Sequence, residues 1–206
     1  DLLEILVERV TGMAFTDYMT EYIAKPLGAT QTGSVVNLFR NENLVKIYDV
    51  NKQPSAFMYR MSVGEGGVLS TAAETCRFGS GFFEGNNALL SEQSKDLMNT
   101  QSTADKYEGM YGFGWDDVDA CAGTGVKVLY KGGNIIGQHS ALLVAPEEQI
   151  SVAVLVAGHG SSGQEEAMVA RKLMNVVLKE RGKDISSVEE SEAVLLDTVP
   201  AQYAEY

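Results

Sequence analysis

Apolar residues gather in three runs in the second half of the chain, separated by segments rich in glycine and polar residues. The first run, Val126–Tyr130, is followed by one lysine, two glycines and an asparagine. A second run ends at Pro146, and a third covers Ile150–Ala157. Short apolar runs bounded by glycine-bearing turns are typical of antiparallel strands. The pattern therefore predicts a ribbon of strands with one cation, Lys131, where the first strand ends.

Helical spacing marks both ends of the chain. Leu2, Leu3, Leu6 and Val10 recur at three- and four-residue intervals, which predicts an amphipathic helix. A second helix is predicted over Phe15–Ala24; it should halt at the following Lys-Pro-Leu-Gly, because a residue before proline disfavours helical backbone. Near the other end, a third helix is predicted over Gln164–Lys179.

Capping signals predict two helices between these ends. Thr71, with glutamate three residues later, forms a capping box that should open a helix running to about Phe83. Ser91 should cap a further short helix. Alternating aromatics and glycines predict a strand over Tyr111–Trp115. Residues 30–61 show no strong period, so a long irregular connection is expected there, and the sequence assigns it no role.

Composition narrows the classes of partner. A net charge of −12 over 206 residues argues against nucleic acid or an anionic membrane surface. No apolar run reaches membrane-spanning length, and no cluster has metal-ligand spacing, so neither a metal nor a cofactor is expected. Cys76 and Cys121 are expected to be small buried apolar residues, and the sequence leaves open whether they pair.

Lys131, Gly132, Gly133 and Asn134 form the candidate site. Glycines lack side chains, so another backbone or a ligand can approach the strand edge there. A lysine beside such an edge can hold a carboxylate, or relay protons if it is partly desolvated. The alternative is a surface hairpin with a solvated lysine, because motifs this short also match by accident.

The run resembles the third motif region of the serine β-lactamase and penicillin-binding-protein superfamily, especially its class C, esterase and D-aminopeptidase branch. In that family a Lys-Thr-Gly or His/Lys-x-Gly triplet lies on an inner strand that lines the active site. Lys131-Gly132-Gly133 matches the triplet, Gly137 and Ser140 the turn, and Pro146-Glu147 the strand end. Gly132 departs from the commonest form, since it offers no hydroxyl to a substrate carboxylate.

Upstream segments carry the same resemblance, so that it covers most of residues 1–180. They are the helix pair at the start, the Gly64–Thr71 stretch and the Tyr111–Trp115 stretch. The resemblance implies an α/β (α+β) fold in which helices flank an antiparallel sheet. Residues 1–182 would be the C-terminal part of a β-lactamase/transpeptidase-like domain. Residues 183–206 would form an acidic linker and the possible start of an appended module.

Two motifs that this chemistry needs are missing from the chain. No serine is followed three residues later by lysine, and no Tyr-x-Asn or Ser-x-Asn triplet occurs. The sequence also opens inside a helical pattern without an initiator Met. We therefore expect a longer parent protein whose upstream sequence holds the serine nucleophile and the second motif.

The resemblance implies roles for the candidate residues. Lys131 would be the third-motif cation, favouring a substrate carboxylate and the deprotonated proton-relay group. The main-chain N–H of Asn134 would be the second oxyanion donor, and Gly132 and Gly133 would border the substrate. His139 and His159 are expected to be structural or solvated, because no G-x-S-x-G elbow accompanies them.

The parent protein is thus expected to be a serine hydrolase outside the cytoplasm. It would open a β-lactam, a D-amino-acid peptide or a small ester through an acyl-serine, and this chain alone should lack turnover. The alternative is a non-catalytic ligand-binding or sensor module that kept the fold. The expected partner is a small-molecule or peptide substrate. The Ile150–Ala157 strand should present a bare apolar edge, which another copy or the rest of the protein would cover.

Overall fold

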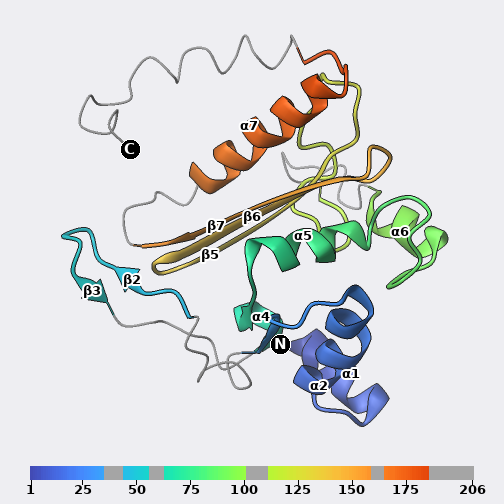
Figure 1. The fold of residues 1–206 in the computed structure, drawn as a ribbon. Helices are drawn as coiled ribbons and strands as arrows, with labels where there is room; N and C mark the ends of the chain where they lie inside the picture. The colour runs from blue at the N-terminus through green and yellow to red at the C-terminus, as the bar shows by residue number, and fades with distance from the viewer. Residues whose placement is uncertain (35–43, 56–62, 101–110, 159–164, 186–206) are drawn as a thin grey trace.

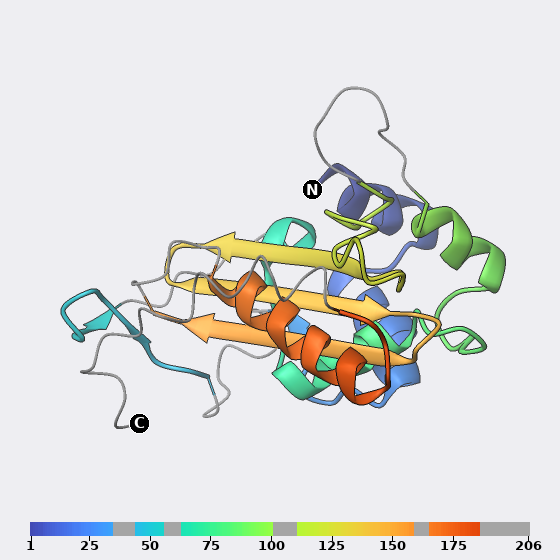
Figure 2. The ribbon, with the colours of Figure 1, turned by 90° about the horizontal axis from the view of Figure 1, so that it is seen from above.

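Three antiparallel strands form the centre of the structure (Figure 1). The computed structural model describes residues 1–34, 44–55, 63–100, 111–158 and 165–185. Strands β5 (Leu129–Ile135), β6 (Gln138–Ala145) and β7 (Ile150–Ala157) lie in the order β5-β6-β7. Helix α7 (Glu165–Glu180) lies on one face and helix α5 (Ala72–Ser80) on the other (Figures 1 and 2). The arrangement confirms the expected α/β (α+β) fold with helices flanking an antiparallel sheet.

The β5–β6 hairpin is longer than the sequence predicts. β5 does not end at Lys131 but continues to Ile135, and Ser140, expected in the turn, pairs with Gly133 inside the hairpin. The turn is Ile136-Gly137, where the glycine has a φ of 72°. Glycine adopts this left-handed conformation without steric cost. Pairing with β6 therefore keeps even the two consecutive glycines extended.

Alternate strand residues face the two helices, and each face has its own apolar cluster. The cluster under α7 contains Cys121, Val126, Val128, Ala141, Leu143, Ala145, Ile150, Ala170, Met174, Leu178 and Ile185. The cluster on the α5 side contains Phe82, Trp115, Val118, Leu129, Leu142 and Val144. Because both faces are covered, the central strand β6 is buried along most of its length.

Helix α5 approaches the sheet closely at Gly79. A Cβ atom at this position would collide with the Ser151 hydroxyl and lie 3.0 Å from Cγ2 of Val144. The α5 helix begins at Ala72 as predicted but ends at Ser80, before Phe83. The last predicted turn is replaced by tight turns in which the N–H groups of Gly81 and Phe82 bond back three residues.

The first helix, α1 (Leu2–Thr11), forms where the sequence predicts it and ends at Gly12 in left-handed backbone. Its apolar stripe, however, stays uncovered by the described part of the chain. Leu2, Leu3 and Val10 are 84 %, 76 % and 76 % exposed. The helical period thus predicted the helix correctly, but the apolar stripe is not buried against the described part of the chain.

The second helix differs from the prediction at its end. Helix α2 (Phe15–Met19) continues as a π-helical segment η1 (Thr20–Ala24) and a 3-10 turn η2 (Lys25–Leu27). Pro26 lies in the first turn of η2, where its missing N–H leaves no bond unmade. The chain therefore stays helical past the predicted stop, and the helical segment ends at Gly28.

The connection over residues 30–61 is mostly irregular, as predicted, where the structure describes it. It contains the two-residue strands β1 (Gly33–Ser34), β2 (Ile47–Tyr48) and β3 (Pro54–Ser55). β2 pairs with β3, and β1 pairs with β4 (Val68–Leu69), which follows the short helix α4 (Val63–Gly66). Residues 35–43 and 56–61 lie outside the described residues.

The predicted strand over Tyr111–Trp115 is absent, and a turn takes its place. The N–H of Gly112 donates to the Trp115 carbonyl at 3.1 Å, and Gly114 has a φ of 86°. Alternating aromatics and glycines imitate the strand period, but the left-handed glycine bends the chain. Trp115 is buried and meets the Phe82 ring edge to face, with centroids 4.9 Å apart.

The two cysteines do not form a disulfide with each other. Cys121 is buried in the α7-side cluster as expected, whereas Cys76 is only partly buried. Ile185 also belongs to this cluster, three residues past the expected domain boundary at 182. The rest of the expected linker and module, residues 186–206, lies outside the described residues. No helix in the described ranges combines the length and apolar character that crossing a membrane requires.

The capping box at Thr71 forms only in part. Thr71 Oγ1 accepts from the Glu74 N–H at 3.2 Å, as predicted. The Glu74 carboxylate instead turns to the preceding loop, where it accepts from the N–H groups of Thr30 and Gln31 and from the Thr32 hydroxyl. Burial alone would raise the pKa of Glu74, but these hydrogen bonds and the Arg77 charge outweigh it, so the pKa lies below its ordinary value of 4.5.

We predict that acid weakens this loop contact. A carboxylate with a lowered pKa in the folded state stabilises the fold fully above pH 4.5, its ordinary pKa. That contribution disappears as the pH falls through the lower folded-state pKa. Glu74→Gln should therefore reduce the free energy of unfolding at pH 7 and flatten its decline between about pH 5 and pH 3. Urea titrations at several pH values measure both effects; parallel pH profiles for the two proteins would contradict the assignment.

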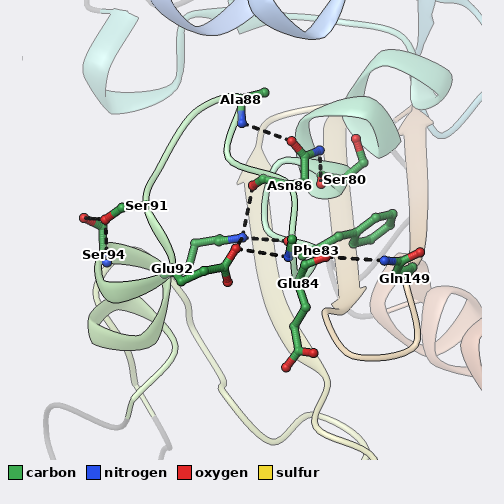
Figure 3. A network of polar contacts seen from close by, with 11 residues as sticks. Ser80, Phe83, Glu84, Asn86, Ala88, Ser91, Glu92, Ser94 and Gln149 are labelled. Atoms are coloured by element: carbon green, nitrogen blue, oxygen red, sulfur yellow. Dashed lines mark hydrogen bonds and ion pairs between the residues drawn. The ribbon is translucent and has the colours of Figure 1, made fainter.

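A buried lysine, Lys95, joins helix α6 (Glu92–Met98) to the loop before it. Ser91 caps α6 as predicted, with its hydroxyl accepting from the Ser94 N–H (Figure 3). Lys95 is 2 % exposed and donates to the carbonyls of Phe83 and Asn86 at 2.7 and 3.0 Å. It also donates to the Glu92 carboxylate at 2.6 Å. Three acceptors therefore satisfy all three ammonium protons.

Removing the ammonium should be more costly than removing its counter-charge. Lys95→Met removes the hydrogen bonds to the Phe83 and Asn86 carbonyls, although the Phe83 carbonyl keeps the Asn86 N–H as a donor, and we expect a loss of about 2 kcal/mol in the free energy of unfolding. Glu92→Gln keeps those two bonds and changes a half-exposed carboxylate, so its effect should be clearly smaller. Chemical denaturation of both variants tests this order, and the reverse order would refute the account.

Strand β7 has a strand neighbour on one side only, within the part of the chain that the structure describes. Leu155, on the face toward α5, is 40 % exposed. Edge strands of this kind readily pair with further strands. Self-association of the chain through Ile150–Ala157 accordingly stays a prediction.

The prediction is a concentration-dependent dimer in sedimentation velocity. Leu155→Lys adds a charge beside the edge and should shift the chain toward monomer. Leu97→Lys is a matched control, because Leu97 is 62 % exposed and lies on α6. A wild-type chain that stays monomeric at all concentrations would show the prediction wrong.

Candidate active-site strand

The outer edge of β5 is covered only over its first residues. The Tyr130 N–H donates to the Asp117 carbonyl at 2.8 Å, and the Tyr130 carbonyl accepts from the N–H groups of Asp116 and Asp117. Before this point, the Ala120 N–H donates to the Val128 carbonyl. Segment 116–120 therefore lines the outer edge of β5 as far as Tyr130. Beyond Tyr130, no strand of the described residues pairs with this edge.

The main-chain donors of β5 continue toward this edge. The Gly132 N–H, like that of Tyr130, points away from β6 and donates to Asp116 Oδ2 at 2.9 Å. Backbone donors alternate along a strand with a period of two, so the Asn134 N–H points to the same edge. Among the residues that the structure describes, no acceptor bonds to it.

Lys131 projects from the α5-side face of the sheet, the face that Leu129 also occupies. Its ammonium donates to both carboxylate oxygens of Asp116, at 2.9 and 3.0 Å, and to the Gly132 carbonyl at 2.9 Å. The Lys131 side chain is 49 % exposed and that of Asp116 is 30 % exposed. The cation is therefore neither buried nor freely solvated: one fixed carboxylate holds it beside the edge.

Neighbouring side chains reach the space that a Cβ atom would take at either glycine. A Cβ atom at Gly132 would collide with the Tyr130 hydroxyl, and one at Gly133 would lie 2.5 Å from Ser140 Oγ. The space over the triplet is thus partly filled by neighbouring side chains, and it is less bare than the sequence suggests.

Tyr130 stays protonated beside these groups. Burial, foremost, raises the pKa of its hydroxyl, and the negative charges of Asp116 and Glu166 add to this effect. Arg171 opposes it; its guanidinium lies 5.5 Å from the centre of the Tyr130 ring. Tyr130 is therefore a neutral donor at physiological pH.

Asp116 is a residue of the candidate site that sequence analysis missed. It lies 15 residues from Lys131 in the chain, directly after the Tyr111–Trp115 stretch that the pattern assigned to a strand. Its only local signal is a pair of aspartates after Trp115, and such pairs are usually solvated.

Other candidate chemistry is less informative. His139 is buried within β6, as a structural histidine would be, and its Nδ1 has no partner in the described residues. His159 lies outside the described residues. No group of three or more potential metal ligands occurs in the described ranges.

Solved structures with the same arrangement define the class of fold. The chain superposes on the octameric penicillin-binding protein homologue from Pyrococcus abyssi with a TM-score of 0.70 and 22 % identity, covering 89 % of this chain and 41 % of that one. The D-stereospecific amidohydrolase from Streptomyces sp. gives a TM-score of 0.63 and 21 % identity, covering 80 % of this chain and 50 % of that one. The penicillin binding protein from Bacillus halodurans gives a TM-score of 0.63 and 20 % identity, covering 84 % of this chain and 53 % of that one.

The family follows from the sequence itself. The Beta-lactamase family model matches residues 1–174, so the chain belongs to this family of serine hydrolases. It has the β-lactamase/transpeptidase-like fold and spans 41–53 % of the length of those three proteins. No curated protein sequence matched the chain significantly.

Proposed function

We propose that this chain is the C-terminal part of a serine hydrolase that opens an ester or amide through an acyl-serine. Its substrate would be a β-lactam, a D-amino-acid peptide or a small ester, and it would work outside the cytoplasm. The serine and the Tyr-x-Asn group would come from sequence upstream of Asp1. In support, the chain belongs to the Beta-lactamase family but contains neither motif.

In this proposal, β5 supplies two groups to the reaction. The serine oxygen attacks the substrate carbonyl carbon while the second-motif group takes its proton, and the carbonyl oxygen becomes negative. The Asn134 N–H would donate to this oxyanion together with the N–H of the serine. The Lys131 charge would favour the deprotonated form of the proton-relay group. Expulsion of the protonated alcohol or amine leaves the acyl-serine, which water then hydrolyses.

One observation carries the proposal. The Asn134 N–H points to a strand edge that no described strand covers, and it lies three residues after Lys131, whose ammonium Asp116 holds beside the same edge. Lys131 is held by two carboxylate oxygens and a carbonyl, so it is not the freely solvated lysine of the hairpin alternative. The uncovered apolar stripe of α1 also fits, because it offers a docking face for an upstream segment.

The experiment uses the longer protein that the gene encodes, assayed with nitrocefin and p-nitrophenyl esters. Lys131→Ala should lower kcat/KM on the order of a hundredfold, because it removes charge stabilisation in the transition state. Lys127→Ala is the matched control, since Lys127 is an exposed lysine just before the same strand.

The chain of residues 1–206 alone should show no turnover in the same assays. Turnover by this chain that Lys131→Ala abolishes would refute the upstream nucleophile. Equal losses in the Lys131 and Lys127 variants would refute the role of Lys131.

A non-catalytic binding or sensor module is the second candidate. Two observations favour it: Asp116 already occupies the Lys131 ammonium, and Gly132 carries no hydroxyl. Covalent labelling of the longer protein by a fluorescent penicillin or an activated phosphonate ester separates the two. A labelled serine favours the hydrolase, and its absence, with Ser-x-x-Lys missing upstream, favours the module.

A further inference from the structure

The ammonium at the proposed site already has a carboxylate partner within the chain. Asp116 contacts Lys131 Nζ through both oxygens, at 2.9 and 3.0 Å. A substrate carboxylate that sought the same ammonium would find its charge compensated, and it would approach a second negative group. Two carboxylates that contact the same ammonium repel each other, and this repulsion is largest where water is partly excluded.

Asp116 is held in place by the backbone on both sides. Its N–H donates to the Tyr130 carbonyl at 2.9 Å, and its Oδ2 accepts from the Gly132 N–H at 2.9 Å. The residue before it, Trp115, is 3 % exposed and anchors the segment in the core. Asp116 is therefore not a surface side chain that a ligand displaces freely.

The next residue along the strand does not replace the lost attraction. Gly132 has no side chain, and the space over it is taken by the Tyr130 hydroxyl, which is neutral. The net charge of −12 adds a field that disfavours anions in general. Every one of these features works against a carboxylate at this edge.

We propose that Asp116 is a specificity-determining residue that makes the site select uncharged esters or amides over substrates bearing a carboxylate on the leaving group. This inference rests on the proposed function, because it assigns a substrate class to that same site. It narrows the choice among β-lactams, D-peptides and small esters toward neutral acyl compounds. Asp116 acts through Lys131 and takes no part in bond making.

The first experiment needs no turnover and uses residues 1–206. N-acetyl-D-alanine and its methyl ester are titrated into the protein, and NMR follows the amide signals of Gly132, Gly133 and Asn134. In Asp116→Asn the carboxylate should bind about fivefold more tightly than in the wild type, while binding of the ester changes less than about twofold. The asparagine oxygen can still accept from Gly132, so the fold should persist.

Asp117→Asn is the matched control for charge. Asp117 is the next residue, but its carboxylate accepts from the Asp119 N–H and lies 3.9 Å from Arg171, not at Lys131. Its carboxylate binding should stay within about twofold of wild type. Three results would overturn the inference: wild-type protein that binds the carboxylate as tightly as Asp116→Asn, equal gains in both variants, or no shift in the Asp116 variant with either ligand.

A second experiment separates this inference from the proposed function. In the longer protein, phenyl and m-carboxyphenyl esters of one acid are compared. The wild type should prefer the phenyl ester, and Asp116→Asn should reduce that preference about fivefold. Hydrolysis of neither ester would refute the hydrolase alone, since the NMR result stands independently. Hydrolysis with a wild-type preference for the carboxylate would refute the specificity and leave the hydrolase intact.

Discussion

The contact between segment 116–120 and the outer edge of β5 determines the character of the whole strand. Its main-chain hydrogen bonds end at Tyr130, and past this point the donors of β5 are left to other partners. The Asp116 side chain takes the next one, at Gly132, and the following one is open. The outer edge of β5 thus changes from covered to open within four residues, without any change in the strand itself. The open N–H of Asn134 depends on the point at which segment 116–120 leaves this edge.

The parts of the fold that sequence predicts well are those with a regular apolar period or a clear capping residue, and α1 shows that the period alone can suffice. The β5–β7 ribbon and α7 fall where apolar residues recur at strand and helix spacing, and both helix N-caps at Thr71 and Ser91 form. Tyr111–Trp115 fails because alternation describes side-chain spacing only, whereas Gly114 decides the backbone. The stop before Pro26 fails because the chain changes helix type there instead of leaving helical backbone.

The candidate site divides in the same way. Lys131 and its glycines can be found from the sequence, since the triplet and the strand around it are local. Asp116 cannot, because its importance arises from a contact across 15 residues and a turn that the pattern misreads. Glu74 shows the same limit: its cap is local and predictable, but its carboxylate serves a loop more than 40 residues away. Sequence period predicts elements, and it carries little information on which polar groups meet between them.

The close packing of Gly79 on Ser151 and Val144 has a mechanical consequence. At that point the α5 backbone lies directly against side chains of β6 and β7, because the atoms nearest to a Cβ at position 79 would be Ser151 Oγ, Val144 Cγ2 and Leu142 Cδ1. The first turn of α5 also holds the loop at residues 30–32 through Glu74. A larger residue at position 79 would press against these side chains, and any displacement of α5 would also move the Glu74 carboxylate that holds residues 30–32. The position of that loop therefore depends on a residue without a side chain near the other end of the helix.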